Sequence, residues 1–416
     1  MVAAPEGTLL FLRRLARVLG PAWVVMLADV DAASVVTAAQ AGTAFGYAML
    51  LPLVLLIPIL YLVQEMTARL AVVTGLGHAE LIRERYGQRW AALAVVAMVA
   101  IDLLAYVAEF AGIVLGASLV GVPAWMAVGG ALLFHAVTVA TGSYARFERI
   151  VIALSLALFA LVGLAIAARP DPGAILAGLS PAQPWGQPAY LDLVVANVGA
   201  VIMPWMLFYQ QGATVDKGLR LEDLRAARWE TLLGAIASEF LMAAIVVAAA
   251  AATAAHARDL ATPAGLLLPA GLAALAHDGA AVLIAIGMIG SGLLAAIVIS
   301  LSSAWAWAEL LRWPHSLNLT LRRAPAFYGL YLLEVVPAAV VALVARNLVS
   351  VVLDTMILNV VALVVPLVFL VRLSSDRALL GSFANSRRRT AVLWCLTAGL
   401  LGLGLTGVVG LLGRVL

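Results

Sequence analysis

The sequence has few charged residues, a single cysteine and no cluster of histidines. Only 11% of its 416 residues are charged, whereas 64% are hydrophobic. This composition excludes an ordinary soluble domain and indicates a polytopic membrane protein. Because Cys395 is the single cysteine, the chain has neither an intrachain disulfide nor a cysteine-based metal site. Five scattered histidines offer no zinc-like cluster.

Long apolar stretches take the place of charge along most of the chain. About 20 apolar residues cross a bilayer as a helix. The sequence contains eleven such stretches, at about 20–44, 48–73, 90–118, 121–142, 149–168, 189–213, 229–255, 279–311, 325–345, 349–371 and 390–413. The first stretch is too long for a signal-peptide core and lacks a small-residue cleavage pattern, so we expect no cleavable signal peptide.

The basic residues predict how the chain is oriented. If the N-terminus lies in the cytoplasm, alternate connections collect most of the arginines and the only lysine, Lys217. The opposite side then receives only Arg169, Arg258, Arg346 and Arg414. Since lysine and arginine accumulate in cytoplasmic loops, we predict an N-terminus inside the cell and a C-terminus outside.

Two predicted spans are interrupted. Asp31-Ala32-Ala33-Ser34 breaks the first span and Met203-Pro204-Trp205 breaks the sixth. A carboxylate at bilayer depth costs about 3 kcal/mol even on lenient insertion scales, and it usually faces a transport pathway or a partner. Broken apolar segments at corresponding positions of two halves indicate a transporter's binding site.

The positions of the breaks predict an internal repeat. A connection rich in proline and glycine, 170–190, separates the fifth span from the sixth. Two halves of five spans each must be inverted relative to one another, with the broken span first in each. We therefore predict one all-α membrane transport domain, 1–416, with a leucine-transporter-like fold of eleven transmembrane helices. Its repeats are about 20–168 and 189–371, and an extra helix follows at about 390–413.

Four segments resemble the NRAMP family of divalent-metal transporters. They are DAASVVTAAQAGTAFGY, VQEMTARLAVVTGLGHAELIRERYG, GAVIMP and SSDRALLGSFANSR, and they distribute the resemblance over essentially the whole chain. The family's first motif reads Asp-Pro-Gly-Asn, followed by Gln-Ala-Gly and Phe-Gly-Tyr. The resemblance implies a carrier of divalent metal ions that needs no partner subunit.

The sequence also departs from the family pattern. Of the first motif only Asp31 remains, because alanines and Ser34 replace its other residues. Trp205 and Gln210 stand where the family has histidines, and Tyr106 replaces an aspartate three residues before a retained glutamate. The resemblance assigns the lost groups to proton movement. The pattern is most similar to the NRAMP-related magnesium-transporter branch.

Asp31 is the main candidate ligand for the ion. Its carboxylate supplies the negative charge that a partly dehydrated divalent cation needs; the alternative is a carboxylate paired with a buried arginine. Ser34 could offer its hydroxyl oxygen or could cap the second half of the span. The thioether of Met203 could bind a transition metal or simply pack. The resemblance further implies ligands in the freed carbonyls of Ala28 and Ala200.

Further candidates lie on other predicted spans. Asn359 aligns with a family glutamine and could approach the ion from the second repeat. We expect Glu65 to add charge to an aqueous cavity, and Glu109 to act as a remote carboxylate that titrates or bridges helices. The complete list of candidates for the pathway or vestibule is Asp29, Glu65, Glu109, Trp205, Gln210 and Asp354.

These features predict inward transport of divalent metal ions, magnesium, manganese or both, across the bacterial cytoplasmic membrane by alternating access without proton coupling. The alternatives are a proton-coupled manganese and iron symporter of the NRAMP type and an amino-acid carrier on the same fold. No His-Glu-x-x-His or Gly-x-Ser-x-Gly element supports an intramembrane enzyme. We expect no cofactor, no nucleic acid and no obligatory protein partner. The expected partners of this monomer are the metal ion and the lipid bilayer.

Overall fold

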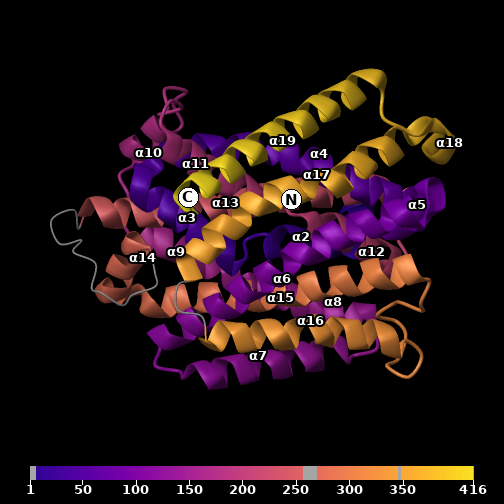
Figure 1. The fold of residues 1–416 in the computed structure, drawn as a ribbon, viewed down its shortest axis with the longest axis horizontal. Coiled ribbons are helices and arrows are strands. Elements are labelled where there is room, and N and C mark those ends of the chain that lie inside the picture. Colours follow the sequence, from indigo (N-terminus) through magenta and orange to yellow (C-terminus); the bar gives the residue numbers. More distant parts are fainter. Residues whose placement is uncertain (1–5, 256–268, 345–347, 416) are drawn as a thin grey trace.

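A computed structural model describes residues 6–255, 269–344 and 348–415. The described residues form helices and connecting loops, with no strand. Nine helices among them are long and apolar enough to cross a membrane. They pack side by side, with their axes running roughly in one direction (Figure 1). Two arginines of the orientation argument, Arg258 and Arg346, lie outside the described residues.

The helices of the first part of the chain are α1 (Glu6–Val18), α2 (Pro21–Ala28), α3 (Ala32–Phe45), α4 (Leu50–Thr74), α5 (His78–Tyr86), α6 (Gln88–Leu119), α7 (Ala124–Val139), α8 (Tyr144–Ser155), α9 (Ala160–Ala167) and α10 (Pro172–Gly178). The remaining α-helices are α11 (Pro188–Val201), α12 (Pro204–Lys217), α13 (Leu224–Ala255), α14 (Ala270–Leu275), α15 (Ala281–Leu311), α16 (Pro325–Val344), α17 (Leu348–Ser375), α18 (Arg377–Leu380) and α19 (Arg387–Val415). Short helical segments of other types are η1 (Gly46–Met49), η2 (Leu156–Phe159), η3 (Leu221–Asp223), η4 (Ala276–Ala280) and η5 (Gly381–Phe383).

Each of the eleven predicted ranges contains helix, but only nine helices of the described chain are long and apolar enough to cross a membrane. The difference has two causes. The chain stays helical from α3 through η1 into α4, so that two predicted spans merge into Ala32–Thr74. The helix α7 contains 16 residues and is shorter than a full span.

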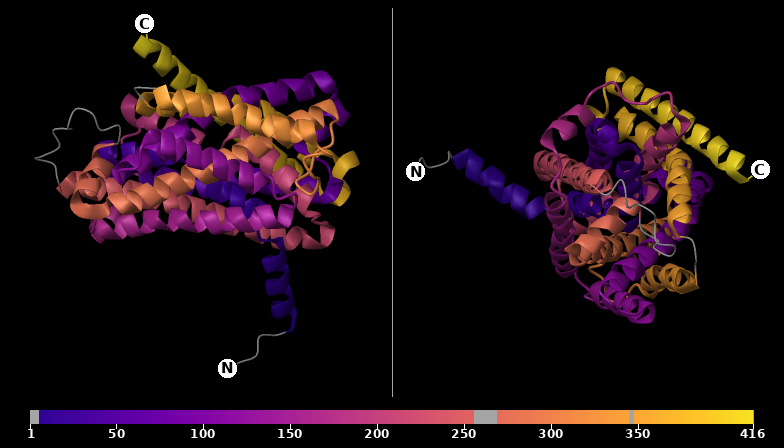
Figure 2. Two further views of the ribbon diagram at one scale, coloured as in Figure 1. Left: turned by 90° about the horizontal axis from the view of Figure 1, so that it is seen from below. Right: turned by 90° about the vertical axis from the view of Figure 1, so that its left-hand side faces the viewer.

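The connections fall at two opposite ends of the bundle, as the orientation argument requires. Figure 1 shows α5 and α18 at one end and α10 and α14 at the other. The sequence predicts the first end to be cytoplasmic and the second to be external. The helix α1 projects away from the bundle (Figure 2), and the Arg17 guanidinium at its base binds the Asp223 carboxylate at 2.8 Å.

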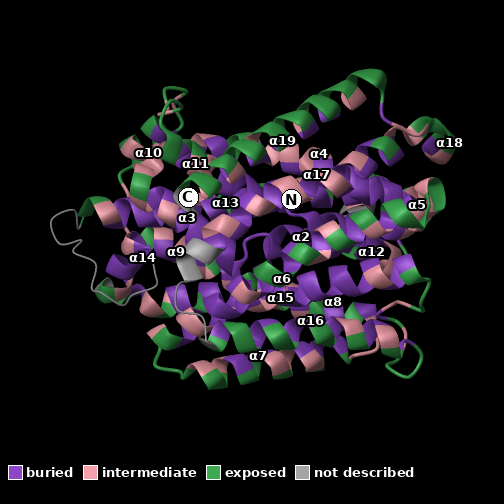
Figure 3. Ribbon diagram, in the orientation of Figure 1, coloured by how far each residue is buried: buried purple, intermediate pink, exposed green. Residues whose placement is uncertain are grey.

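Both predicted interruptions are confirmed, and each has a local cause. Asp31 adopts an extended conformation between α2 and α3, and its carboxylate caps α3. Between α11 and α12, Met203 is extended and Pro204 is the first residue of α12. Proline lacks an N–H and has a fixed φ, so it is suited to begin a helix and cannot continue one. Buried residues concentrate on these central helices, whereas α7 and α19 show exposed outer faces (Figure 3).

Close helix contacts around the interruptions depend on glycine. A Cβ atom at Gly112 of α6 would lie 2.2 Å from the Cβ of Ala32. A Cβ atom at Gly199 of α11 would lie 1.8 Å from the Met356 carbonyl oxygen of α17. Both distances are far inside van der Waals contact, so glycine allows α6 and α17 to approach the broken helices.

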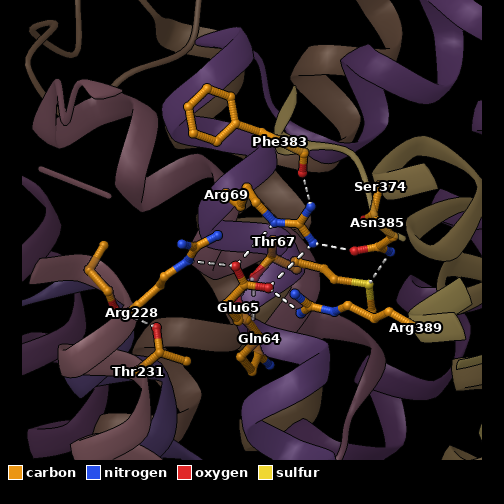
Figure 4. A network of polar contacts seen from close by, with 12 residues as sticks. Gln64, Glu65, Thr67, Arg69, Arg228, Thr231, Ser374, Phe383, Asn385 and Arg389 are labelled. Carbon is orange, nitrogen blue, oxygen red and sulfur yellow. Dashed lines mark hydrogen bonds and ion pairs between the residues drawn. The ribbon is translucent and has the colours of Figure 1, made fainter. Parts of the chain in front are cut away.

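The structure contradicts the expectation that Glu65 lines an aqueous cavity. Its side chain is 1% exposed and binds three arginines: Arg69 at 3.1 Å, Arg228 at 2.9 Å and Arg389. Figure 4 shows these guanidinium groups converging on the carboxylate from α4, α13 and α19. Arg69 also donates to the Phe383 carbonyl and to Asn385. A buried carboxylate needs partners of this kind, and here they fasten α19 to the bundle.

Candidate ion-binding site

Asp31 lies at the centre of the first break and is fully buried. One carboxylate oxygen accepts the Ser34 backbone N–H at 2.5 Å, which begins α3. The other oxygen has no hydrogen-bond partner in the described part of the chain. No arginine or lysine side chain of that part forms an ion pair with Asp31, so the alternative of a carboxylate locked to a buried arginine is not observed.

Glu109 lies beside Asp31 and is therefore not the remote carboxylate that the sequence suggested. Its Oε2 accepts the Ala32 N–H at 3.0 Å, and the two carboxyl groups are neighbours. Its Oε1 has no partner among the described residues. The side chain thus bridges α6 to the first break and adds a second carboxylate to the centre.

Ser34 connects the two breaks. Its hydroxyl donates to the Ala200 carbonyl oxygen at 3.1 Å, across from α3 to α11. The alternative role of Ser34 as a helix cap is wrong, because Asp31 is the cap and Ser34 is the residue whose N–H it receives. Ala28 and Ala200 lie in the last turns of α2 and α11. Carbonyls of a last turn lack donors within their own helix.

The thioether of Met203 already has a polar neighbour. Trp205 donates its indole N–H to the Met203 sulfur at 3.2 Å, and both side chains are fully buried. Trp205 stands where the family has a histidine, and its indole N–H points toward the Met203 sulfur. A thioether that accepts a hydrogen bond is less available to a metal ion.

The remaining candidates lie on α17, on α12 and at the end of α2. Asn359 is buried on α17, which packs against α3 and α11, and its Oδ1 has no partner among the described residues. Gln210 lies further along α12 and donates to Thr231 of α13 at 3.3 Å. Asp354 is partly exposed, about one and a half turns before Asn359 on α17. Asp29 ends α2, and one of its oxygens accepts the Ser238 hydroxyl at 3.1 Å.

A cleft lies on the predicted external side of the site. It has a volume of about 410 Å³ and lies between α3, α11 and α17. Gln40 and Asp192 are its polar lining residues. Ala196, which also lines it, lies one turn before Ala200 on the same helix.

On the opposite side, three polar side chains hold the beginning of α2. Glu230 of α13 accepts the backbone N–H groups of Gly20, Ala22 and Trp23 at 2.6, 3.1 and 3.0 Å. Lys217 binds the Leu19 carbonyl at 2.7 Å and the Glu148 carboxylate at 2.8 Å. None of these three residues is among the candidates predicted from the sequence. The signal for this group was the single lysine of the chain together with a glutamate near the start of an apolar helix.

Two interrupted helices that meet at a buried acidic centre, inside a bundle of membrane-length helices, define a multi-pass membrane transporter. Residues 22–410 match the Nramp family, natural resistance-associated macrophage protein-like. The chain belongs to the Nramp family.

Known proteins similar to this chain agree with that assignment. The chain is 29% identical to the divalent metal cation transporter MntH of Mycobacterium tuberculosis, over 90% of this chain and 87% of the relative. It is also 29% identical to the MntH protein of Xanthomonas campestris pv. campestris, over 97% of this chain and 92% of the relative.

Solved structures show a similar fold. A manganese transporter of Eremococcus coleocola has a TM-score of 0.77 and 21% identity, with 97% of this chain and 88% of that chain covered. A Na⁺-coupled sialic acid symporter in an outward-open state has a TM-score of 0.64 and 11% identity, with coverage of 94% and 90%. At these identities the likeness concerns the fold alone. It confirms the predicted leucine-transporter-like fold class, and family membership identifies a transporter, not an enzyme.

Proposed function

We propose that this protein carries divalent metal ions inward by alternating access, without a proton partner, and that it accepts magnesium as well as manganese. The ion would lie between the two breaks, with Asp31, Ser34 and Ala200 as its nearest ligands. Ala28, Met203 and Asn359 complete the proposed ligand set. We further propose that the two halves of the chain are inverted repeats and that a single chain suffices for transport.

One observation supports this proposal most strongly: buried oxygen atoms without partners surround the breaks. Asp31 Oδ2, Glu109 Oε1 and Asn359 Oδ1 are all buried, and no N–H or hydroxyl group of the described residues donates to them. Within that part of the chain, the Asp31 and Glu109 carboxyl groups have only each other as polar neighbours at these oxygens. Burying a polar or charged oxygen without a partner costs several kcal/mol. A bound divalent cation with part of its water shell would supply the missing positive charge and donors.

The character of these donors favours a hard ion. Oxygen ligands suit magnesium, which keeps several waters when it binds. The Met203 sulfur is the one soft donor in the proposed ligand set. It already accepts a hydrogen bond from the Trp205 indole, which leaves oxygen atoms as the main ligands. Ala32 and Ala33 replace the proline and glycine of the family motif and bring no soft ligand to the break.

Proton coupling is not required for uptake on energetic grounds. A membrane potential of 100 mV, negative inside, favours entry of two charges by about 4.6 kcal/mol. This free energy corresponds to a concentration ratio of roughly a thousandfold. Trp205 cannot accept a proton, in contrast to the histidine that it replaces.

A second candidate function is a proton-coupled symporter of manganese or iron. The observation that favours it is the proximity of the Glu109 and Asp31 carboxyl groups. Two adjacent buried carboxylates can share a proton, which an arriving metal ion could displace.

Uptake into proteoliposomes separates the two candidates. Magnesium, manganese and calcium entry would each be measured with and without a pH gradient, while a trapped dye reports internal pH. We expect metal entry that follows the membrane potential and leaves the internal pH unchanged. Acidification of the lumen in proportion to metal entry would instead establish the symporter.

A further inference from the structure

A second pair of buried carboxylates, Asp29 and Glu239, belongs to α2 and α13, which pack against each other. Glu239, in the middle of α13, is 2% exposed, and neither of its oxygens has a hydrogen-bond partner among the described residues. Asp29 is fully buried, and its Oδ1 is likewise without a partner. Ser238, the residue before Glu239, donates its hydroxyl hydrogen to Asp29 at 3.1 Å, so α13 brings Glu239 to the end of α2.

No protein cation in the described part of the chain neutralises this pair. The basic side chains of α13 are Arg225 and Arg228, both near its start, and Lys217 lies at the end of α12. Arg225 lies over the Phe11 ring, with its guanidinium carbon 5.4 Å from the ring centroid. Arg228 binds Glu65 at 2.9 Å, and Lys217 binds Glu148 at 2.8 Å. Two uncompensated carboxylates inside the bundle would be strongly unfavourable, so a positive charge from outside the protein is required if both are ionised.

The oxygen atoms near the two carboxylates are of the kind that bind a hard cation. The Ser238 hydroxyl already contacts Asp29 at 3.1 Å, which brings a neutral oxygen to the same place. Asp29 ends α2, and the carbonyls at a helix C-terminus carry partial negative charge. The helix α13 packs against both α2 and α3, so these atoms share one helix interface.

We propose that Asp29, Glu239 and Ser238 form a second binding site for a hard divalent cation, separate from the site at Asp31. The two carboxylates balance the charge of one divalent ion, and water completes its coordination. The proposal rests on the proposed function, because the ligand is the transported class of ion. Since Asp29 and Asp31 flank the same break, the second site receives the ion when α2 moves during inward opening.

Counting bound ions tests this proposal. Purified full-length protein would be titrated with Mn²⁺, and the free ion would be measured by electron paramagnetic resonance. We expect two bound ions in the unchanged protein, one in Glu239→Gln, one in Asp31→Asn and none in the double variant. The ion lost in Glu239→Gln should bind at least tenfold more weakly, a loss typical of a disrupted metal site.

Matched variants keep the result interpretable. Glu84→Gln removes an exposed carboxylate and should retain both ions. Glu239→Asp keeps a carboxylate at this position and should also bind two ions. Two ions in Glu239→Gln, in protein with an unchanged gel-filtration profile, would overturn the second site. If Asp31→Asn retained both ions while Glu239→Gln lost one, the proposed transport site would fail and the second site would stand.

Discussion

The hydroxyl of Ser34 donates a hydrogen bond to the carbonyl oxygen of Ala200, 166 residues away in sequence, at 3.1 Å and thereby joins the two helix breaks. Ser34 belongs to the first turn of α3, and Ala200 to the last turn of α11. One contact therefore fixes the relative position of the two halves of the proposed ion site.

Removing that contact should weaken transport without abolishing it. In Ser34→Ala the two breaks lose one hydrogen bond, which contributes about 1 kcal/mol, and the proposed site loses one neutral ligand, so the uptake rate at low magnesium should fall at least about fivefold. Initial rates in proteoliposomes measure this effect. Ser303→Ala serves as the control, because that buried hydroxyl donates to Asp102 at 3.1 Å and not to the breaks. Equal rates in Ser34→Ala and the control would show that the bridge has no part in transport.

Trp205 should influence the choice between metals through the Met203 sulfur. In Trp205→Phe the thioether loses its 3.2 Å indole donor and becomes available to a soft ion. We expect manganese uptake to rise severalfold relative to magnesium uptake in competition assays. Trp305→Phe is a matched control, since Trp305 is also a buried tryptophan and lies on α15, away from the Met203 sulfur. A manganese-to-magnesium ratio unchanged by Trp205→Phe would contradict the selectivity argument.

Glu230 should keep the protein closed on the predicted cytoplasmic side. Its carboxylate accepts three backbone N–H groups at the start of α2, and hydrogen bonds to a charged group contribute about 1.5–3 kcal/mol. Glu230→Gln should therefore shift the population toward an inward-open state by at least about tenfold.

Cysteine labelling measures that shift. Cys395, the one native cysteine, is exposed and would first be replaced by serine. Ala33→Cys then reports access to the break from the cytoplasmic side with an impermeant thiol reagent. Labelling should accelerate in Glu230→Gln and stay unchanged in Glu222→Gln, whose carboxylate is exposed. Equal labelling in both variants would argue against a closing role.

Glu65 should be essential for stability rather than for ion binding. Glu65→Gln leaves Arg69, which is 2% exposed, without its buried counter-charge. Breaking a buried pair in this way costs about 3 kcal/mol, and the melting temperature in detergent should fall by several degrees. The exposed-site control Glu84→Gln should melt like the unchanged protein. A Glu65→Gln variant of undiminished melting temperature would remove the basis for this role.

The sequence predicted the parts of the structure that depend on local composition. Apolar length located the spans, and one carboxylate and one proline located the two breaks. Contacts between segments that are distant in sequence could not be predicted from local composition. Glu65 and Arg69 are four residues apart and could be paired from helical spacing, but Arg228 and Arg389 join them from 163 and 324 residues away.

The same limit applied to the candidate site. Glu109 was expected to be remote because its helix register against α3 cannot be read from a uniformly apolar sequence. The Trp205 to Met203 hydrogen bond spans only two residues, yet it depends on the extended conformation of Met203 at the break. Glu239 was noticeable as a carboxylate in an apolar helix, whereas its relation to Asp29 required the packing of α13 on α2.

Replacement of the Asp31 carboxylate by its uncharged isostere tests the central claim most directly. Magnesium uptake by Asp31→Asn would be measured in proteoliposomes at a potential of 100 mV, negative inside, beside the unchanged protein and Asp171→Asn, which alters an exposed helix cap. We predict uptake close to that of empty liposomes for Asp31→Asn and full uptake for the control. Full-rate uptake by Asp31→Asn would contradict a metal site at the meeting point of the two breaks.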